Sequence, residues 1–411
     1  MKNKILLTGL ALLVAISLVA AGCAAPSPAE KEKAPSAPAT IKIGIVTDIT
    51  GPISAMGQAF LWGVRKDVET VNEDGGIYIK EFDKKIPIEL IEADHAADIN
   101  KAIVQAEYVN TQGVVAVIGT TSFLPGGAAA TEKYGLPCLL ELSYNKKPFE
   151  LGYKYMFTKW PRTDDFGKTF IAFLNSLPED QRPTTIAIFE GIEEIGVEMA
   201  TYCEQEALAN GYKAKRIKFE MLAQDLSAQI LEAKKIGADA VYGLMLTPTA
   251  LLMVKQMQEL DYNPKVALID MGSTNPDVWM NVLGKAGNYI YCFLQFVKGM
   301  EWPGANEFVA AFEAANPGQH YYDPAASGYS GMQIVVDAIT RAGSLDREKI
   351  RDALATTDMV TIVGPVKFRA NGTMEREYAT IVQYQDGVQT IVFPPELKQK
   401  PAIPMPTWKE R

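Results

Sequence analysis

Histidine and the short motifs of common catalytic sites are the scarcest features of this 411-residue sequence. Its two histidines, His95 and His320, have no metal-ligand spacing to any partner. The motifs GxSxG, HExxH and GxGxxG are absent, and so is a P-loop. The sequence therefore predicts a protein that is not an enzyme and holds no metal or cofactor. Both histidines are expected to be ordinary surface or loop residues.

Cysteine is nearly as scarce, with four residues in the whole chain. Cys23 lies close to the N-terminus, and Cys138, Cys203 and Cys292 are widely separated. This spacing fits neither a metal clip nor a redox CxxC motif. We expect the three later cysteines to be small core residues, and the sequence leaves open whether any two of them pair.

Positive charge is in the minority, with 40 Lys and Arg against 49 Asp and Glu, for a net charge of −9. No region is strongly basic, which argues against nucleic acid as a partner. Adjacent acids such as Glu193-Glu194 and Asp164-Asp165 fall in the first turns of expected helices. We interpret them as partners of the helix dipole rather than as catalytic pairs.

Only the N-terminus has a long hydrophobic run, over residues 5–19, after Lys2 and Lys4. This pattern predicts a secretion signal peptide at 1–22, too short for a comfortable membrane span. The next residues, Ala20-Ala21-Gly22-Cys23, resemble a bacterial lipobox, which predicts that Cys23 is lipidated. The alternative is an ordinary signal peptide cut after an alanine. Residues 23–40, rich in Pro, Ala and Ser, then read as a flexible linker between anchor and body.

The stretch 41–65 organises the rest of the chain. An apolar, β-branched run at 41–46 predicts a buried strand, and Gly51-Pro52 predicts a turn. A helix is expected after this turn, with Ser54 as a candidate cap and apolar residues at helical spacing from Met56 onward. In open α/β sheets, a small-residue loop between strand and helix lies at the ligand crevice, where backbone N–H groups can hold an anion.

Strands and helices then alternate in two consecutive series, which predicts doubly wound α/β structure in two lobes. Strands are expected at 85–93, 114–119, 137–142, 185–189, 216–222, 240–245, 266–270 and 289–297. Helices are expected near 98–112, 163–174, 194–210, 226–236, 248–260, 306–315, 325–342 and 347–356. The segment 366–393 alternates and contains Asn371-Gly372, a strong hairpin signal.

Six stretches together resemble one protein family: 41–58, 114–122, 151–167, 238–245, 326–339 and 364–372. They are similar, in order, to the periplasmic leucine/isoleucine/valine-binding proteins, the type I substrate-binding proteins of ABC importers. The resemblance implies a two-lobed, periplasmic-binding-protein-like α/β fold in which each lobe is a mostly parallel, doubly wound sheet. It places lobe 1 at 41–158 plus 298–360 and lobe 2 at 161–295 plus 365–394, with a C-terminal tail at 395–411. Three crossovers at the hinge would fall near 159–162, 296–298 and 361–365.

The family's ligand residues come from loops at the carboxyl ends of strands. The resemblance places at those positions Met56, Thr121, Ser122, Ser143, Tyr144, Thr247 and Asp270. The segment 270–274 reads DMGST and lacks the Glu that commonly pairs with a ligand ammonium in this family. Asp270 could substitute for that Glu if it points inward, and a cysteine pair found in some members is replaced by Ala97 and Ser122.

At the expected first crossover, the sequence reads Lys159-Trp160-Pro161-Arg162. Two cations and an indole could clamp a carboxylate and stack an apolar tail, so Trp160 and Arg162 join the candidate ligand residues. The alternatives are solvated surface charge for the cations and hinge packing for Trp160.

These expectations describe an extracytoplasmic lipoprotein, monomeric, held at the cell membrane by Cys23. It would capture a small carboxylate between closing lobes and deliver it to an ABC permease and ATPase complex. The ligand would be a branched-chain or other apolar amino acid, or a related amino-free acid. The alternatives are a sensory protein of the same fold that presents its closed state to a receptor, and a secreted enzyme.

Overall fold

The computed structural model describes residues 36–124, 126–375 and 379–411. Within it, residues 38–411 form one compact unit. The predicted signal peptide, Cys23 and the linker up to residue 35 lie outside the described residues. Their limits stay predictions, as do the residue limits of the lobes.

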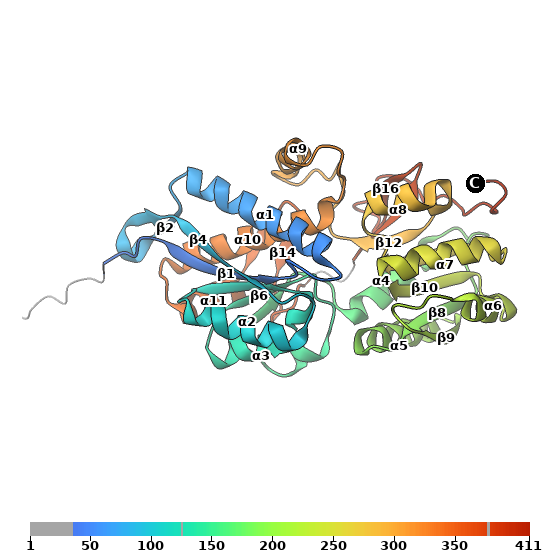
Figure 1. Ribbon diagram of the computed structural model, residues 1–411, viewed down its shortest axis with the longest axis horizontal. Helices are drawn as coiled ribbons and strands as arrows, with labels where there is room; N and C mark the ends of the chain where they lie inside the picture. Colours follow the sequence, from blue (N-terminus) through green and yellow to red (C-terminus); the bar gives the residue numbers. More distant parts are fainter. Residues whose placement is uncertain (1–35, 125, 376–378) are drawn as a thin grey trace, which may run out of the picture. The chain divides into compact units, whose positions relative to one another are not determined.

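The first sheet is wholly parallel, with strand order β4-β1-β5-β6-β7. Its strands are β1 (Ile41–Thr47), β4 (Ile88–Asp94), β5 (Ala116–Thr120), β6 (Cys138–Glu141) and β7 (Met156–Thr158). One face is covered by α2 (Ile99–Thr111) and α3 (Gly126–Lys133), the other by α1 (Ser54–Glu73) and α10 (Tyr322–Ala342) (Figure 1). Because both faces are covered, β1 and β5 are almost completely buried, as their unbroken apolar sequence predicts.

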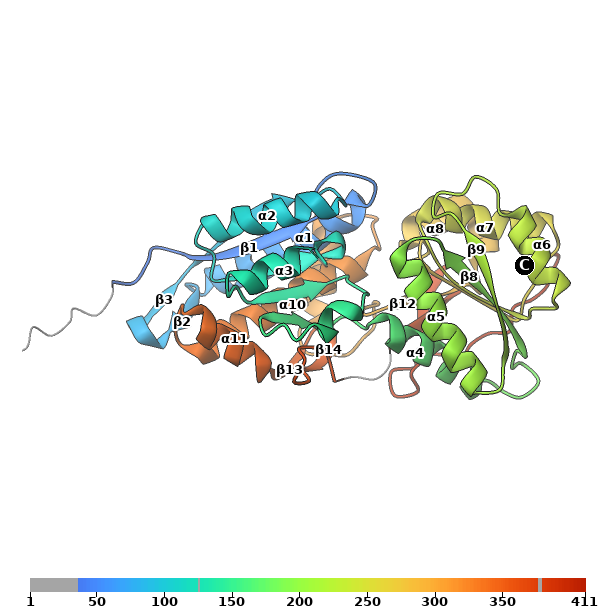
Figure 2. The ribbon, with the colours of Figure 1, turned by 90° about the horizontal axis from the view of Figure 1, so that it is seen from below.

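The second sheet has the strand order β16-β15-β12-β11-β10-β8-β9. Its parallel strands are β8 (Thr185–Gly191), β9 (Lys213–Phe219), β10 (Ala240–Met245), β11 (Val266–Met271) and β12 (Tyr291–Leu294). An antiparallel pair, β15 (Thr380–Gln385) and β16 (Val388–Phe393), completes it. Helices α4 (Thr163–Ser176) and α5 (Glu194–Ala209) pack together beside it (Figure 2). The remaining helices are α6 (Ser227–Lys235), α7 (Thr247–Glu259) and α8 (Pro276–Leu283).

The chain passes between the two sheets more than once. It leaves the first sheet after β7, and after β12 it returns to form α9 (Ala305–Ala315), α10 and α11 (Arg347–Ala355). A small hairpin of β13 (Asp358–Thr361) and β14 (Gly364–Lys367) precedes its second entry into the larger sheet. A further hairpin, β2 (Ile77–Ile79) with β3 (Lys84–Ile86), lies beside the first sheet. The predicted α/β fold with two doubly wound, mostly parallel sheets is confirmed.

Three predicted strands differ from the observed ones. The strand expected at 85–93 is divided at Pro87 into β3 and β4. The strand expected at 216–222 is β9, which begins three residues earlier because it is an edge strand that exposes its lysines. The strand expected at 289–297 ends at Leu294, because the N–H groups of Gln295 and Phe296 donate to the Asp323 carboxylate instead of to a neighbouring strand.

The C-terminal segment contains two tight turns. Asn371-Gly372 turns as expected, with an isolated antiparallel bridge between Phe368 and Met374. The longer pair, β15 and β16, turns at Asp386-Gly387, where both residues have positive φ, as a two-residue hairpin requires. The tail at 395–411 packs onto the larger sheet, where Trp408 is buried and its Nε1 donates to the carbonyl of Tyr262.

Both histidines lie outside helices and strands, as expected, but His95 is not an ordinary loop residue. His95 is completely buried, with Nδ1 3.3 Å from Asp48 Oδ1 and Nε2 3.1 Å from the carbonyl oxygen of Thr120. His320 is exposed and pairs with Asp277 at 2.7 Å. Cys138, Cys203 and Cys292 are buried and form no disulfide within the described residues.

Candidate functional site

A cavity of about 280 Å³ lies where the carboxyl ends of strands from both sheets meet. Loops after β1, β5 and β6 form one wall, and the ends of β8, β9, β10 and β11 contribute to the other. This is where parallel α/β sheets place their ligands. The lining residues are Ile53, Met56, Ile99, Thr121, Leu124, Leu142, Ser143, Tyr144, Asn145, Glu193, Glu194, Ile195, Met221, Leu244 and Met271.

The first wall carries hydroxyl groups whose hydrogens are already in use. Thr121 Oγ1 donates to Asp48 Oδ2 at 2.6 Å, and Ser143 Oγ donates to the carbonyl of Glu141 at 3.1 Å. Both oxygens therefore keep lone pairs that can accept from a ligand. Thr121 has φ of 42°, which is rare for a β-branched residue and is typical of functional loops.

Behind the first wall, Asp48 and His95 form a buried pair whose contacts fix the position of the loop after β5. Burial raises the pKa of Asp48, and the neighbouring His95 opposes that shift. Because Asp48 accepts from Thr121 and His95 contacts Thr120, the pair ties the ends of β1 and β5 together. It thereby positions Thr121 at the cavity without lining the cavity itself.

Tyr144 gives the first wall its aromatic surface. Its ring packs against Phe166 with centroids 5.2 Å apart and against Trp160 at 5.9 Å. Burial raises the pKa of Tyr144 well above its ordinary value, so the hydroxyl keeps its proton and remains a donor.

The second wall carries two carboxylates at the N-terminus of α5, both exposed. Glu194 Oε1 lies 3.2 Å from Lys147 Nζ, which belongs to η3 (Lys147–Glu150) of the opposite lobe. The Glu193 side chain lies close to Gly191 at the end of β8. A Cβ on Gly191 would be only 3.0 Å from Glu193 Oε2 and 3.1 Å from Met221 Sδ. Among the described residues, no cation forms an ion pair with Glu193.

The structure brings four of the predicted ligand residues to this cavity: Met56, Thr121, Ser143 and Tyr144. Ser122 follows Thr121 in η2 (Thr121–Phe123). Thr247 begins α7, and it does not line the cavity.

Asp270 lies at the end of β11 but is turned into the protein and is 1% exposed. Its Oδ1 accepts from the N–H of Phe293 at 3.1 Å, and its Oδ2 has no hydrogen-bond partner within the described part of the chain. Burial raises the pKa of Asp270 to about 7. Asp270 does not line the cavity, whereas its neighbour Met271 does. A role for Asp270 in binding a ligand ammonium stays a prediction.

The first crossover is also separate from the cavity. Arg162 pairs with Asp164 and Asp165 at the start of α4, with N–O distances of 3.4 and 3.3 Å. Trp160 is buried beside a much smaller hollow of about 30 Å³, and its Nε1 has no partner among the described residues. Lys159 pairs with Glu141. Lys159 and Arg162, the two cations that the sequence pattern suggested for binding a ligand carboxylate, are therefore both paired with acids of the protein.

Sequence reasoning missed most of the second wall. Glu193 and Glu194 were noticed as a pair but attributed to the helix dipole, and Met221, Leu244 and Met271 look like ordinary strand residues. Their positions in the sequence could have indicated them as lining residues, because each of them lies at or just after the end of a parallel strand.

The model of a periplasmic binding protein family matches residues 40–388. The chain belongs to this family. A curated relative, a Leu/Ile/Val-binding protein homolog from Brucella abortus, is 26% identical over 392 residues, with 87% of this chain and 92% of the relative covered. Within the described residues, no helix has the length and apolar character needed to cross a bilayer, and no cluster of His, Cys, Asp and Glu could hold a metal.

Solved structures share the type I fold. A leucine-binding protein from Thermotoga maritima superposes with a TM-score of 0.76 at 22% identity, covering 86% of this chain and 97% of that one. A solute-binding protein from R. palustris, solved with benzoate, has a TM-score of 0.73 at 16% identity and covers 90% and 98% of the two chains.

Proposed function

We propose that this protein is an extracytoplasmic binding lipoprotein that captures a small carboxylate with an apolar tail and delivers it to an ABC importer. The observation that carries the proposal is the cavity lined by strand ends from both lobes. Its volume lies near the lower end of the roughly 300–1,000 Å³ range of ligand pockets, which suits a small ligand.

The lining favours an amino acid within this ligand class. Most of the lining side chains are apolar, which suits a branched-chain or other apolar tail. The two charged lining residues, Glu193 and Glu194, are both acids. A zwitterion would place its ammonium near Glu193, whereas an amino-free anion would meet negative charge without a compensating cation.

Capture depends on lobe closure. A ligand that contacts both walls stabilises the closed form by its differential affinity for that form. The relatives named Leu/Ile/Val-binding proteins and the benzoate complex support a small carboxylate as the ligand.

A thermal-shift series on residues 38–411 tests the ligand. Leucine is expected to raise the melting temperature by several degrees, because a ligand at a hundred times its Kd stabilises by about 2.7 kcal/mol. Two analogues of leucine show which of its charged groups the protein needs, since 4-methylpentanoate lacks the ammonium and 3-methylbutylamine lacks the carboxylate. We expect leucine to shift most. No shift with any carboxylate would overturn the proposed function, and turnover of a bound compound would show an enzyme instead.

The lipid anchor is a separate part of the proposal, and Cys23 lies outside the described residues. A Cys23→Ala variant is expected to move the protein from the membrane fraction to the soluble fraction, or to accumulate it uncleaved. Fractionation of cells with detection of the protein measures this. Unchanged membrane attachment would show that Cys23 is not the anchor.

A further inference from the structure

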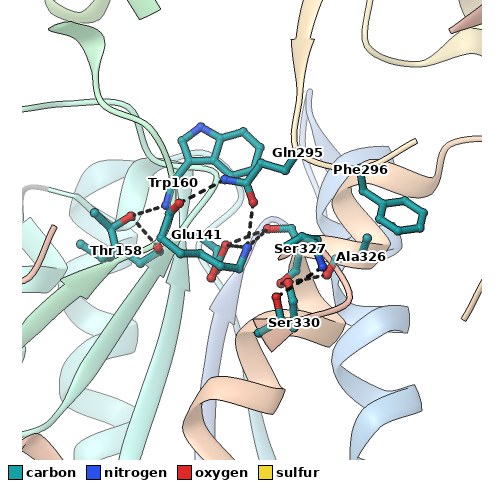
Figure 3. A network of polar contacts seen from close by, with 12 residues as sticks. Glu141, Thr158, Trp160, Gln295, Phe296, Ala326, Ser327 and Ser330 are labelled. Atoms are coloured by element: carbon teal, nitrogen blue, oxygen red, sulfur yellow. Dashed lines mark hydrogen bonds and ion pairs between the residues drawn. The ribbon is translucent and has the colours of Figure 1, made fainter. Parts of the chain in front are cut away.

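A buried polar network connects the first lobe to the chain segments that run between the sheets (Figure 3). At its centre, Lys159 Nζ donates to Glu141 Oε2 at 2.7 Å, with side chains 1% and 0% exposed. Ser327 Oγ of α10 also donates to Glu141 Oε2, at 2.7 Å. Glu141 ends β6 and Ser327 belongs to α10, so both sit on the first lobe. Lys159 directly follows β7, on the segment that leads to the second lobe.

Gln295 joins this network from a second connecting segment. It follows β12, where the chain leaves the larger sheet. Gln295 Oε1 accepts from Lys159 Nζ at 2.9 Å, and Gln295 Nε2 donates to the carbonyl of Lys159 at 3.3 Å. Two segments 136 residues apart in sequence are therefore linked by a reciprocal pair of hydrogen bonds (Figure 3).

The segment after β12 is also bound to the first lobe through backbone hydrogen bonds. The N–H groups of Gln295 and Phe296 both donate to Asp323 Oδ1 at 2.7 Å, and Asp323 lies in the first turn of α10. Both segments are thus attached to the first lobe at the point where they approach the second. Only residues 160–162 separate Lys159 from α4, and Gln295 follows Leu294 of β12 directly.

Stability alone does not account for this arrangement. Replacing a buried ion pair by well-packed apolar residues is often neutral or stabilising. None of Glu141, Lys159, Gln295 and Ser327 lines the 280 Å³ cavity, so the network has no direct role in holding a ligand. Glu141 Oε1 has no hydrogen-bond partner within the described residues, so the network is not fully satisfied. What it does supply is a specific geometry, because its hydrogen bonds form together in one arrangement only.

We propose that Lys159 and Gln295 are positioning residues that hold two of the connecting segments on the first lobe as one unit. Within these two segments, lobe closure would then bend only residues 160–162 and the Leu294–Gln295 junction. The inference rests on the proposed function, because it assumes that closure captures the ligand. A hinge restricted in this way samples fewer lobe orientations, so less conformational entropy is lost when the ligand closes the cavity. The network would thereby raise ligand affinity without touching the ligand.

The test measures lobe orientation directly. Spin labels on Lys101→Cys of α2 and Lys255→Cys of α7 report the interlobe distance, because both positions are exposed and the three core cysteines are buried. The measurements use the full-length chain carrying Cys23→Ala. Gln295→Leu removes the link between the segments and leaves the Lys159–Glu141 pair in place. Ser330→Ala is the control, since Ser330 lies next to the network in α10 but bonds only to carbonyls of its own helix (Figure 3).

Gln295→Leu is expected to broaden the interlobe distance distribution of the ligand-free protein and to weaken leucine binding about fivefold, mainly through faster dissociation. Ser330→Ala is expected to change the melting temperature without broadening the distribution. The double variant Glu141→Leu/Lys159→Met removes both members of the ion pair together, so neither is left without the other, and it should broaden the distribution as well. A distribution unchanged in both Gln295→Leu and the double variant, with both proteins folded, would overturn the inference. Failure of leucine and 4-methylpentanoate to bind wild-type protein would overturn the proposed function, and the ligand-free distributions would still test the hinge.

Discussion

Glu193→Gln is expected to weaken leucine binding at least about tenfold while leaving binding of 4-methylpentanoate unchanged or tighter, because it removes a negative charge beside that anion. Glu193 is an acid on the cavity wall that has no ion-pair partner among the described residues. Lobe closure would remove water from its carboxylate, and an ammonium at that point would supply the missing counter-charge. The glutamine keeps the shape and the hydrogen-bonding capacity but loses the charge. Titration calorimetry of both ligands measures the two affinities.

Glu194→Gln is the matched control for this prediction. Glu194 is the next residue in the chain and also lines the cavity, but Lys147 already pairs with it at 3.2 Å. Its replacement should reduce leucine affinity less than the replacement of Glu193, because exposed ion pairs contribute little. Equal losses for leucine and 4-methylpentanoate in Glu193→Gln would show a structural effect. No loss for either ligand would show that the ammonium is held elsewhere or that the ligand has none.

Gly63→Ala is expected to destabilise the folded protein by about 3 kcal/mol or more. Helices α1 and α10 cross in close contact at this glycine. A Cβ on Gly63 would overlap the carbonyl oxygen of Ala325 and lie 2.7 Å from its carbon and 2.9 Å from the N of Tyr329. These are backbone atoms of a buried helix, so the overlap can be relieved only by moving the helices apart. The gain of about 1 kcal/mol from alanine's helix propensity does not offset that displacement.

Gly126→Ala is the control for Gly63→Ala. The nearest atoms to a Cβ on Gly126 belong to side chains, Ile103 at 2.6 Å and Ile99 at 3.7 Å. Ile103 is 36% exposed and has room to change its rotamer, whereas a packed helix backbone has none. We therefore expect a loss below about 1 kcal/mol for Gly126→Ala by denaturant unfolding. A similar small loss for Gly63→Ala would contradict the packing argument. The position also matters for binding, because α1 carries Met56 in its first turn to the cavity, and separated helices would displace it.

Local patterns in the amino-acid sequence were enough to predict the fold class and the order of most elements. The apolar β-branched runs at β1, β5 and β10 are buried strands, and the helices between them follow the 3.6-residue period. These features are local, since each depends on residues a few positions apart. The family resemblance, rather than any local pattern, indicated Met56, Thr121, Ser143 and Tyr144 as candidate ligand residues, and all four line the cavity.

The roles of the charged and polar side chains depend on how the elements pack, and the sequence did not predict them. Lys159 looked like a surface cation or a ligand clamp, but its partners are Glu141, Gln295 and Ser327, the last of which is 168 residues away. Asp270 ends a predicted strand and His95 lies in a loop, yet both are buried against residues of other elements. Glu193 lines the cavity together with Met221, and the side chains of both lie close to Gly191 at the end of β8. Whether a charge is buried, paired or left facing a cavity depends on neighbours distant in sequence, and a local pattern contains no information about them.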